Sequence, residues 1–396
     1  MTHQEQSTPF HELVQLLAEH GFDGMAQAIE ILMNEAMKLE RNETLQAAPY
    51  QRTTTRQGYA NGFKSKTVNS RLGALQLQIP QTRDVEFYPS TLQRGERSER
   101  ALKLAVAEMY VQGVSTRKVA EITHELCGLD ISSSQVSRAA TLLDEELEKW
   151  RNRALGHVPY LILDARYEKV RHGGSVVDCA VLLAAGVTPD GKRSILGVSV
   201  SLSEAEVHWR TFLKSLIQRG LHGVEIITSD AHEGLAAARK ACFNGIAWQR
   251  CQFHLQQNAR QYVPKVFMRD EVVTDLRAIF NAPDRPEADR QLKTAVDKYA
   301  ESAPKLAEWM EANVPESLAV FALPEAHRCK LRTTNMLERL NKEIKRRTRV
   351  ATLFPNDASL LRLVSAVLAE ISEDWETGKI YLRIENLDPL PEQRRG

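Results

Sequence analysis

Runs of apolar residues predict a sheet in the middle of the chain. Two of these runs, residues 159–164 and 224–230, end in an aspartate, Asp164 and Asp230. Between and after them the pattern predicts two strands (176–187 and 194–200), an amphipathic helix (204–219) and a further strand (246–251).

The order of these elements predicts where the two aspartates meet. A crossover through the helix would make the Asp230 strand parallel to a neighbour, most simply the Asp164 strand. The right-handedness of such connections leaves few other arrangements. Both carboxylates then lie at one edge of the sheet. Carboxylates so placed can share hard divalent cations, and two such ions about 3.5 to 4 Å apart suit in-line attack at phosphate.

A strongly basic helix is predicted far downstream, at residues 331–350. Its apolar stripe is Leu337, Leu340 and Ile344, at i, i+3 and i+7. Residues 328–349 hold nine Lys or Arg and two Glu, a local charge of +7. A single acid among such bases can hold a metal while the bases hold phosphates. The neighbouring polar face carries Asn335, Glu338, Asn341, Lys342, Lys345 and Arg349.

Several blocks of sequence carry a resemblance to a known family. The block Thr333-Thr-Asn-x-x-Glu-Arg-x-Asn-x-x-Ile-Lys-Arg-Arg-Thr348, followed by Phe354-Pro-Asn356, resembles the C-terminal signature of the Mutator-like family of bacterial insertion-sequence transposases. Residues 163–171, 229–235 and 248–254 agree, as do shorter blocks at 58–62, 79–80 and 87–90. The similarity runs from about Arg52 onward, in the family's order.

The resemblance implies a fold and a reaction. Asp164, Asp230 and Glu338 match the family's catalytic Asp, Asp and Glu, which implies an α/β RNase H-like catalytic core interrupted by an all-helical insertion. It also implies DNA strand cleavage and strand transfer by a two-metal mechanism, with two Mg²⁺ (or Mn²⁺) ions per site. Asn341, Lys342, Lys345, Arg346 and Arg349 are then expected to contact DNA.

Composition limits the class of partner. At 396 residues with 43% hydrophobic content, the chain can bury two or three cores. A net charge of only +1 does not by itself indicate a DNA partner. The acidic and basic residues are, however, concentrated in different parts of the chain. Residues 1–50 carry eight acids and two bases (net −6), whereas residues 51–75 carry five bases and no acid. We therefore expect DNA to bind at local basic patches and not through the electrostatic field of the whole protein.

Cysteine usage and hydropathy predict the compartment. Five cysteines, odd in number and scattered, do not form a disulfide framework, which favours a reducing environment. The first residues lack the basic and apolar regions of a signal peptide, and no run approaches 18 apolar residues. We expect a cytoplasmic, nucleoid-associated protein with no membrane partner.

Helical spacing organises the N-terminal part. Residues 10–46 predict a helical hairpin that dimerises or caps, and residues 72–79 alternate as in a strand. Three helices are expected at 99–112, 115–126 and 132–149. The second and third helices, with the turn between them, resemble a helix-turn-helix motif in which the third is the recognition helix. Ser134, Gln135 and Arg138 would then face bases or phosphates. A three-helix spacer that does not touch DNA gives the same pattern.

The gap between Asp230 and Glu338 is too long for one connection in a compact domain, so a helical insertion is expected there. The pattern thus divides the chain into an N-terminal helical segment (1–50), a small basic β segment (51–96), a helix-turn-helix-like DNA-binding region (97–152), the first part of an RNase H-like core (153–255), a helical insertion (256–327) and the rest of the core with its Glu-bearing basic helix and a C-terminal helix (328–396).

Each candidate residue also has a plainer interpretation. Asp164 and Asp230 can cap helices, and Asn335 with Glu338 has the spacing of a capping box. Cys251-x-x-His254 invites a zinc site, but no second ligand pair follows, so a buried thiol with a hydrogen-bonded histidine that organises the site is preferred. Arg166 and Arg171, just past Asp164, are expected to contact phosphates as strand-tip residues.

Three functions fit these observations. The first is a transposase acting on double-stranded DNA, namely the terminal inverted repeats and the target, as a homodimer or higher oligomer. The others are a non-catalytic DNA-binding regulator and an RNase H-like nuclease or resolvase. Inverted repeats flanking the reading frame would favour the first.

Overall fold

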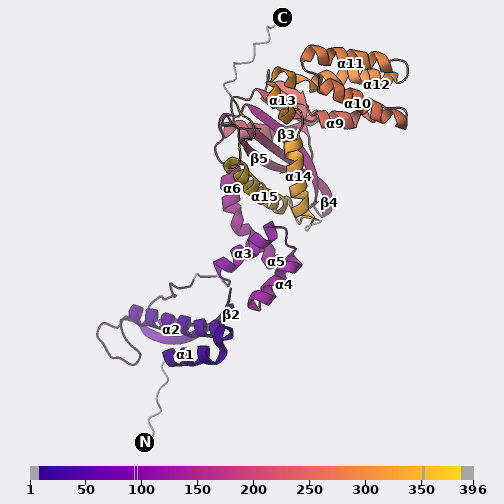
Figure 1. The fold of residues 1–396 in the computed structure, drawn as a ribbon. Helices are drawn as coiled ribbons and strands as arrows, with labels where there is room; N and C mark the ends of the chain where they lie inside the picture. The colour runs from indigo at the N-terminus through magenta and orange to yellow at the C-terminus, as the bar shows by residue number, and fades with distance from the viewer. Residues whose placement is uncertain (1–8, 93, 96, 350–352, 385–396) are drawn as a thin grey trace. The chain divides into compact units, whose positions relative to one another are not determined.

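The computed structural model describes residues 9–92, 94–95, 97–349 and 353–384. The chain forms two compact units, Met1–Leu143 and Asp144–Gly396 (Figure 1). None of the helices in the described residues combines the length and the apolar character that crossing a bilayer requires.

The first unit begins with a helical hairpin and a β-hairpin. Leu75, Leu77 and Ile79 alternate along the second strand and are buried against Met37 of the longer helix. The predicted helical hairpin and β segment are therefore confirmed. The elements are α1 (Pro9–His20), the 3-10 turn η1 (Gly21–Gly24), α2 (Met25–Leu45), β1 (Tyr59–Ser70) and β2 (Gly73–Arg83), with β1 and β2 antiparallel.

Three short helices complete this unit around a core of their own. The Ser115 side chain caps the second helix, and Ser132 forms a capping box with Gln135 at the start of the third. The predicted single helix at 132–149 is wrong, because a 3-10 turn divides it and its second half belongs to the other unit. The elements are α3 (Arg100–Val111), α4 (Thr116–Cys127), α5 (Ser133–Ala140) and η2 (Thr141–Leu143).

The second unit is a mixed α/β structure built on one five-stranded sheet. Its strand order is β5-β4-β3-β6-β7, with β3, β4 and β5 antiparallel and β6 and β7 parallel to β3. The predicted parallel pairing of the two Asp-bearing strands is confirmed. The strands are β3 (Tyr160–His172), β4 (Ser175–Val187), β5 (Arg193–Ser201), β6 (Ile226–Ser229) and β7 (Ala247–Arg250).

Helices cover both faces of this sheet (Figure 1). Leu161 and Leu163 of β3 pack with Trp209 of α7 (Glu206–Gln218) and Leu235 of α8 (Glu233–Cys242). Because side chains alternate along a strand, Ile162 and Asp164 belong to the opposite face. That face is covered by α14 and α15, whose residues contact β3. The helices of this face are α14 (Asn335–Thr348) and α15 (Asp357–Thr377), and α6 (Asp144–Arg151) packs against α15.

All the secondary structure between β7 and α14 is helical, as predicted, and most of it shares a separate apolar core. Figure 1 shows α9 to α12 grouped beside the sheet. The elements are α9 (Gln252–Ala259), η3 (Val266–Met268), α10 (Arg269–Phe280), α11 (Arg285–Tyr299), α12 (Pro304–Asn313), η4 (Val314–Ser317), η5 (Ala319–Ala322) and α13 (Glu325–Leu331).

One predicted strand end is wrong. β3 does not stop at Asp164 but continues to His172, paired throughout with β4. The polar residues after Asp164 ended the apolar pattern, yet one side of the strand is exposed there and tolerates them. Phe354, which is buried, extends the sheet beside Val170. Asp164 therefore lies within a long strand, and only Asp230 directly follows a strand end.

Candidate active site

Strand register places the two aspartates opposite each other. β3 and β6 pair through Tyr160 with Ile226, Leu161 with Ile227 and Ile162 with Thr228. Continuing this register by two residues sets Asp230 beside Asp164, on strands about 4.8 Å apart. Two acids that are distant in the sequence thus meet at one point of the sheet.

The Asp164 carboxyl group is buried, with 5% of the residue exposed. Burial, together with the charge of Asp230, raises its pKa to about 7 against the opposing effect of nearby His254. Asn341 of α14 donates from Nδ2 to Asp164 Oδ2 at 2.8 Å. The ionised form of a buried carboxyl group beside a second carboxylate is energetically unfavourable unless a cation neutralises it.

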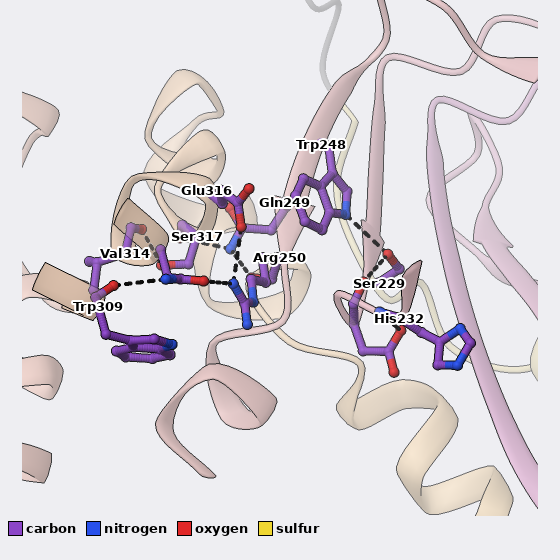
Figure 2. A network of polar contacts seen from close by, with 11 residues as sticks. Ser229, His232, Trp248, Gln249, Arg250, Trp309, Val314, Glu316 and Ser317 are labelled. Atoms are coloured by element: carbon purple, nitrogen blue, oxygen red, sulfur yellow. Dashed lines mark hydrogen bonds and ion pairs between the residues drawn. The ribbon is translucent and has the colours of Figure 1, made fainter. Parts of the chain in front are cut away.

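A chain of hydrogen bonds holds the segment that carries Asp230 (Figure 2). The Trp248 indole Nε1 donates to Ser229 Oγ at 3.0 Å, and Ser229 Oγ donates to the Asp230 carbonyl oxygen at 2.7 Å. The Asp230 Oδ1 atom accepts from the His232 backbone N–H at 3.3 Å. These contacts fix the turn between β6 and α8.

β7, the strand that carries Trp248, is hydrogen-bonded to the helical insertion. Arg250 donates to Asn313 Oδ1 at 2.7 Å and forms an ion pair with Glu316 at 3.0 Å (Figure 2). The Gln249 Nε2 group donates to the Ser317 carbonyl oxygen at 2.8 Å. Because Trp248 contacts the Asp230 turn, β7 connects the insertion to the aspartate pair.

α14 brings Glu338 and Asn341 to the same face of the sheet. Its N-cap is Thr334, with no side-chain cap, so the alternative in which Asn335 and Glu338 form a capping box is wrong. The Glu338 Oε1 atom is buried and has no hydrogen-bond partner in the described part of the chain. Glu338 lies one turn before Asn341, which contacts Asp164 directly.

Cys251 and His254 lie against this site. The Cys251 Sγ atom accepts from the Thr334 backbone N–H at 3.3 Å. A hydrogen bond with Cys251, together with the charges of Asp164 and Asp230, raises the pKa of His254 to about 9 despite its burial. At neutral pH His254 therefore brings a positive charge to the two carboxylates.

The basic side chains of α14 differ in their surroundings. Lys342, Lys345 and Arg349 are exposed and form no ion pair with other described residues. By contrast, Arg346 pairs with Glu343 at 2.6 Å. The three unpaired cations are thus available to an external anion.

Arg166 and Arg171 do not lie at a strand tip, because β3 continues past both. Arg166 is largely buried, forms an ion pair with Glu168 and donates to the Asn341 carbonyl oxygen. Arg171 is exposed, seven residues along the strand from Asp164. Arg166 thus supports α14, a role that the sequence did not suggest.

The three candidate DNA readers of the first unit lie at the start of α5. Ser134 and Arg138 are exposed. The Gln135 side chain accepts from the Ser132 backbone N–H at 2.7 Å, completing the capping box. Its carboxamide oxygen is therefore already in use.

Glu204 is a candidate site residue that the sequence pattern does not reveal. This acid precedes α7, is only 8% exposed and lies 3.8 Å from the His232 ring. Burial raises its pKa, and so does the charge of Asp230. No local motif marks Glu204, because its position depends on how α7 packs against α8. There Gly234 lies so close to the Glu204 carbonyl that a Cβ atom would not fit.

The donor set partly fits a divalent cation. Asp164 and Asp230 supply hard oxygen ligands, and Glu338 has an unpartnered buried oxygen nearby in the fold. Within the residues described, however, no three His, Cys, Asp or Glu side chains are close enough together to hold a metal ion. The fit thus rests on the aspartate pair.

Comparison with known proteins places this geometry in a family. The family described as "Transposase, Mutator family" matches residues 1–378. The chain belongs to the Mutator family of transposases. Its relatives in this family include the transposase for insertion sequence element IS406 of Burkholderia multivorans, 56% identical over 384 residues, which are 96% of this chain and 99% of that protein.

Two further transposases extend the comparison. That for element ISRM5 of Rhizobium meliloti is 43% identical and covers 94% of this chain and 93% of its own length. The one for IS256 in transposon Tn4001 of Staphylococcus aureus is 36% identical, covering 92% of this chain and 94% of that protein. The family resemblance drawn from the sequence blocks is therefore confirmed.

Proposed function

We propose that this transposase cleaves and joins double-stranded DNA at the ends of its own insertion element, through a site built on Asp164, Asp230 and Glu338. The observation that carries the proposal is the register of β3 and β6, which places two carboxylates side by side where Asn341 contacts one of them. The strand order, with a crossover through α7 that joins the parallel strands β5 and β6, supports an RNase H-like core.

Asp164 and Asp230 would hold the divalent ions, Mg²⁺ or Mn²⁺, and Glu338 would complete one ligand set. When bound, such ions polarise the scissile phosphate and lower the pKa of an attacking water or 3′ hydroxyl. The raised pKa of Asp164 in the protein alone is consistent with a site built to neutralise these acids with a cation.

The remaining residues position the two acids and the DNA. Asn341 orients one oxygen of Asp164 through its hydrogen bond. The Trp248–Ser229 pair fixes the turn that carries Asp230, and His254 supplies a positive charge beside both carboxylates. The exposed Lys342 and Lys345 lie on the same helix as Glu338 and would hold phosphates, since Lys is a point-charge partner for phosphate oxygens.

The other DNA-binding residues proposed here are Arg349 of the same basic helix and, at the start of α5, Ser134 and Arg138. An insertion element has two ends, so a homodimer or larger assembly of this chain would bring both ends together.

A cleavage assay tests this function. Full-length protein is incubated with a duplex that carries the terminal inverted repeat of the element, with Mg²⁺, with Mn²⁺ or with a chelator. We expect nicking at the element end only with a metal, followed by joining of the freed 3′ end to a second duplex. Binding to the repeat without nicking in either metal would instead support the DNA-binding regulator. Metal-dependent cleavage without joining would support the nuclease.

A further inference from the structure

The β-hairpin of the first unit has one exposed face that the proposed site does not use. Leu75, Leu77 and Ile79 point toward α2 and are buried. The residues between them, Gln76 and Gln78, are exposed. β1 and β2 thus form a two-stranded ribbon with a helix on one side and an open polar face on the other.

Side chains of this open face are paired across the strands. Thr67 Oγ1 donates to Gln76 Oε1 at 2.9 Å, and Ser65 Oγ donates to Gln78 Oε1 at 3.2 Å. Neither carboxamide Nε2 group donates to another group in the part of the chain that the structure describes. The face therefore presents two oriented amides with free donors, flanked by small hydroxyl side chains and by no charge.

The edge of the ribbon is closed to another strand. Glu30 and Asn34 of α2 accept from the backbone N–H groups of Gln76 and Gln78. These are the groups that a further strand would need for pairing. A partner that adds a β-strand along β2 is therefore excluded at these positions, and the open face is left as the binding surface.

The charge around the ribbon selects an anionic partner. No acid occurs between Glu43 and Asp84, while the same stretch carries Arg52, Arg56, Lys64, Lys66, Arg71 and Arg83. Of these, Lys64 on β1 is exposed and forms no ion pair with other described residues; it is opposite Ile79, so it lies on the α2 side of the ribbon, at the border of the open face. A neutral face rich in hydrogen-bonding groups, bordered by cations, matches base edges bordered by phosphates.

We propose that this ribbon face enters the major groove of duplex DNA and that Gln76 and Gln78 read base edges there. The inference deepens the proposed function and rests on its DNA-binding part. The major groove of B-DNA admits a two-stranded β-ribbon, and a glutamine can bond adenine N6 and N7 together. Gln76 and Gln78 are about 7 Å apart along the strand, close to two base-pair steps of about 3.4 Å.

The hydrogen bonding at the start of α5 supports a second base-reading element in this unit. Gln135 is fixed by a backbone N–H group in the capping box of that helix, so turning its carboxamide toward a base would break the cap. The Gln76 and Gln78 oxygens accept only side-chain hydroxyls of the ribbon among the described residues, and each oxygen keeps a second lone pair for an adenine N6 group. Only Ser134 and Arg138 remain exposed among the three candidate readers there. The ribbon amides supply the adenine-reading chemistry that α5 lacks.

Fluorescence anisotropy on full-length protein tests this assignment. The probes are a duplex of the element's terminal inverted repeat and a duplex of the same composition in shuffled order. The measured quantity is the Kd for the shuffled duplex divided by the Kd for the repeat duplex. We expect this ratio to be at least about tenfold smaller in the double variant Gln76→Ala, Gln78→Ala, because bidentate base contacts carry the discrimination. The slope of log Kd against log salt should stay unchanged, because no phosphate contact is removed.

Gln15→Ala is the matched control, since Gln15 is an exposed glutamine on α1 whose side chain donates to Glu19. It should leave the ratio unchanged. A folded double variant that keeps the wild-type ratio would overturn the ribbon assignment, as would a wild-type protein that does not discriminate between the two duplexes.

Base analogues provide a readout that does not depend on the variant's folding. 7-Deazaadenine removes the N7 acceptor from the major groove. We expect two such substitutions, two base-pair steps apart, to weaken binding of the wild-type protein. Interference at no such pair of positions contradicts the inference. If the double variant loses discrimination and the wild-type protein does not cleave, the ribbon assignment is upheld and the catalytic proposal is rejected. If the wild-type protein cleaves and the double variant keeps its discrimination, the catalytic proposal is upheld and the ribbon assignment is rejected.

Discussion

At the scale of single residues, the two aspartates are held by different means. Asp164 is fixed within a long strand and contacted from above by Asn341, whereas Asp230 lies on a turn whose shape depends on Ser229 and Trp248. Asp230 is therefore the acid whose position is more easily disturbed by a change nearby.

Trp248→Phe tests this dependence. Phenylalanine keeps a ring beneath Arg239, whose guanidinium lies 4.6 Å from the Trp248 ring, and removes only the indole donor. We expect kcat for nicking to fall by about two- to tenfold, the value of one net hydrogen bond, and the metal concentration for half-maximal rate to rise. The Kd for DNA should stay unchanged, because Trp248 has no predicted DNA contact.

Trp309→Phe is the control, because Trp309 stacks on Tyr262 within the insertion. It should leave the metal requirement of nicking as it is in the wild-type protein. An equal effect of both substitutions would mean that Trp248 matters only for the stability of the fold.

The aspartate pair could be predicted from the sequence because it depends on strand order, which the apolar pattern encodes. The roles of Asn341, Arg166 and Glu204 could not. Each depends on a contact between residues distant in the chain, such as Asn341 with Asp164, 177 positions apart. Periodicity places a side chain on a face of its own helix but does not identify its partner.

At the scale of elements, α14 combines two kinds of basic residue. Arg346 and Arg347 bond Glu343 and hold the pKa of that carboxyl at about 2, whereas Lys342, Lys345 and Arg349 have no such partner among the residues that the structure describes. The first group belongs to the folded structure of the helix. We assign the second to DNA.

Glu343→Gln should lower the free energy of unfolding at pH 7 by roughly 0.5 to 1 kcal/mol, the usual value of a partly exposed ion pair. The folded-state pKa is lowered, so the contribution is fully present above about pH 4.5 and is lost as the pH falls through about 2. Urea unfolding at pH 7 and at pH 3 measures both values. A difference that grows on acidification would contradict the ion-pair assignment; Glu311→Gln, at an exposed acid without a described ion pair, is the control.

Neutralising Lys342, Lys345 and Arg349 together should weaken binding of the repeat duplex and of unrelated duplex about equally, because phosphates carry no sequence code. The slope of log K against log salt should fall by about 0.9 for each phosphate that the variant no longer neutralises. A variant that fails to discriminate between the two duplexes while its slope stays unchanged would show that this face reads bases instead.

The matched control for this triple variant neutralises Arg277, Lys293 and Lys305. These residues are exposed on the insertion helices and form no ion pair with described residues. They should leave the salt slope unchanged.

Helix and strand bounds were predictable where the apolar pattern is strong, as for 176–187 against β4, Ser175–Val187. They were not predictable where packing overrides it. β3 runs past Asp164 because β4 pairs with it to the end. The expected helix at 132–149 breaks because Asp144 pairs with Arg362 of α15, drawing α6 into the second unit.

At the scale of the whole molecule, we propose that the first unit recognises the element end and that the second unit carries out the chemistry. A fragment beginning at Asp144 should keep a folded core, because it retains α6 with the Asp144–Arg362 and Arg151–Ser365 contacts. We expect it to lose preference for the element end over unrelated duplex, measured by competition binding, because both the ribbon and α5 are removed. Retained preference in a folded fragment would move recognition into the catalytic unit.

The central claim is that Asp164, Asp230 and Glu338 perform the chemistry while other residues hold the DNA. The most direct measurement compares nicking and binding of the element-end duplex for Asp164→Asn, Asp230→Asn and Glu338→Gln, with Glu343→Gln as the control acid on the same helix. The account predicts that each of the three variants abolishes metal-dependent nicking with Kd nearly unchanged, while Glu343→Gln still nicks. Near wild-type nicking by any one of the three would contradict the assignment of that residue.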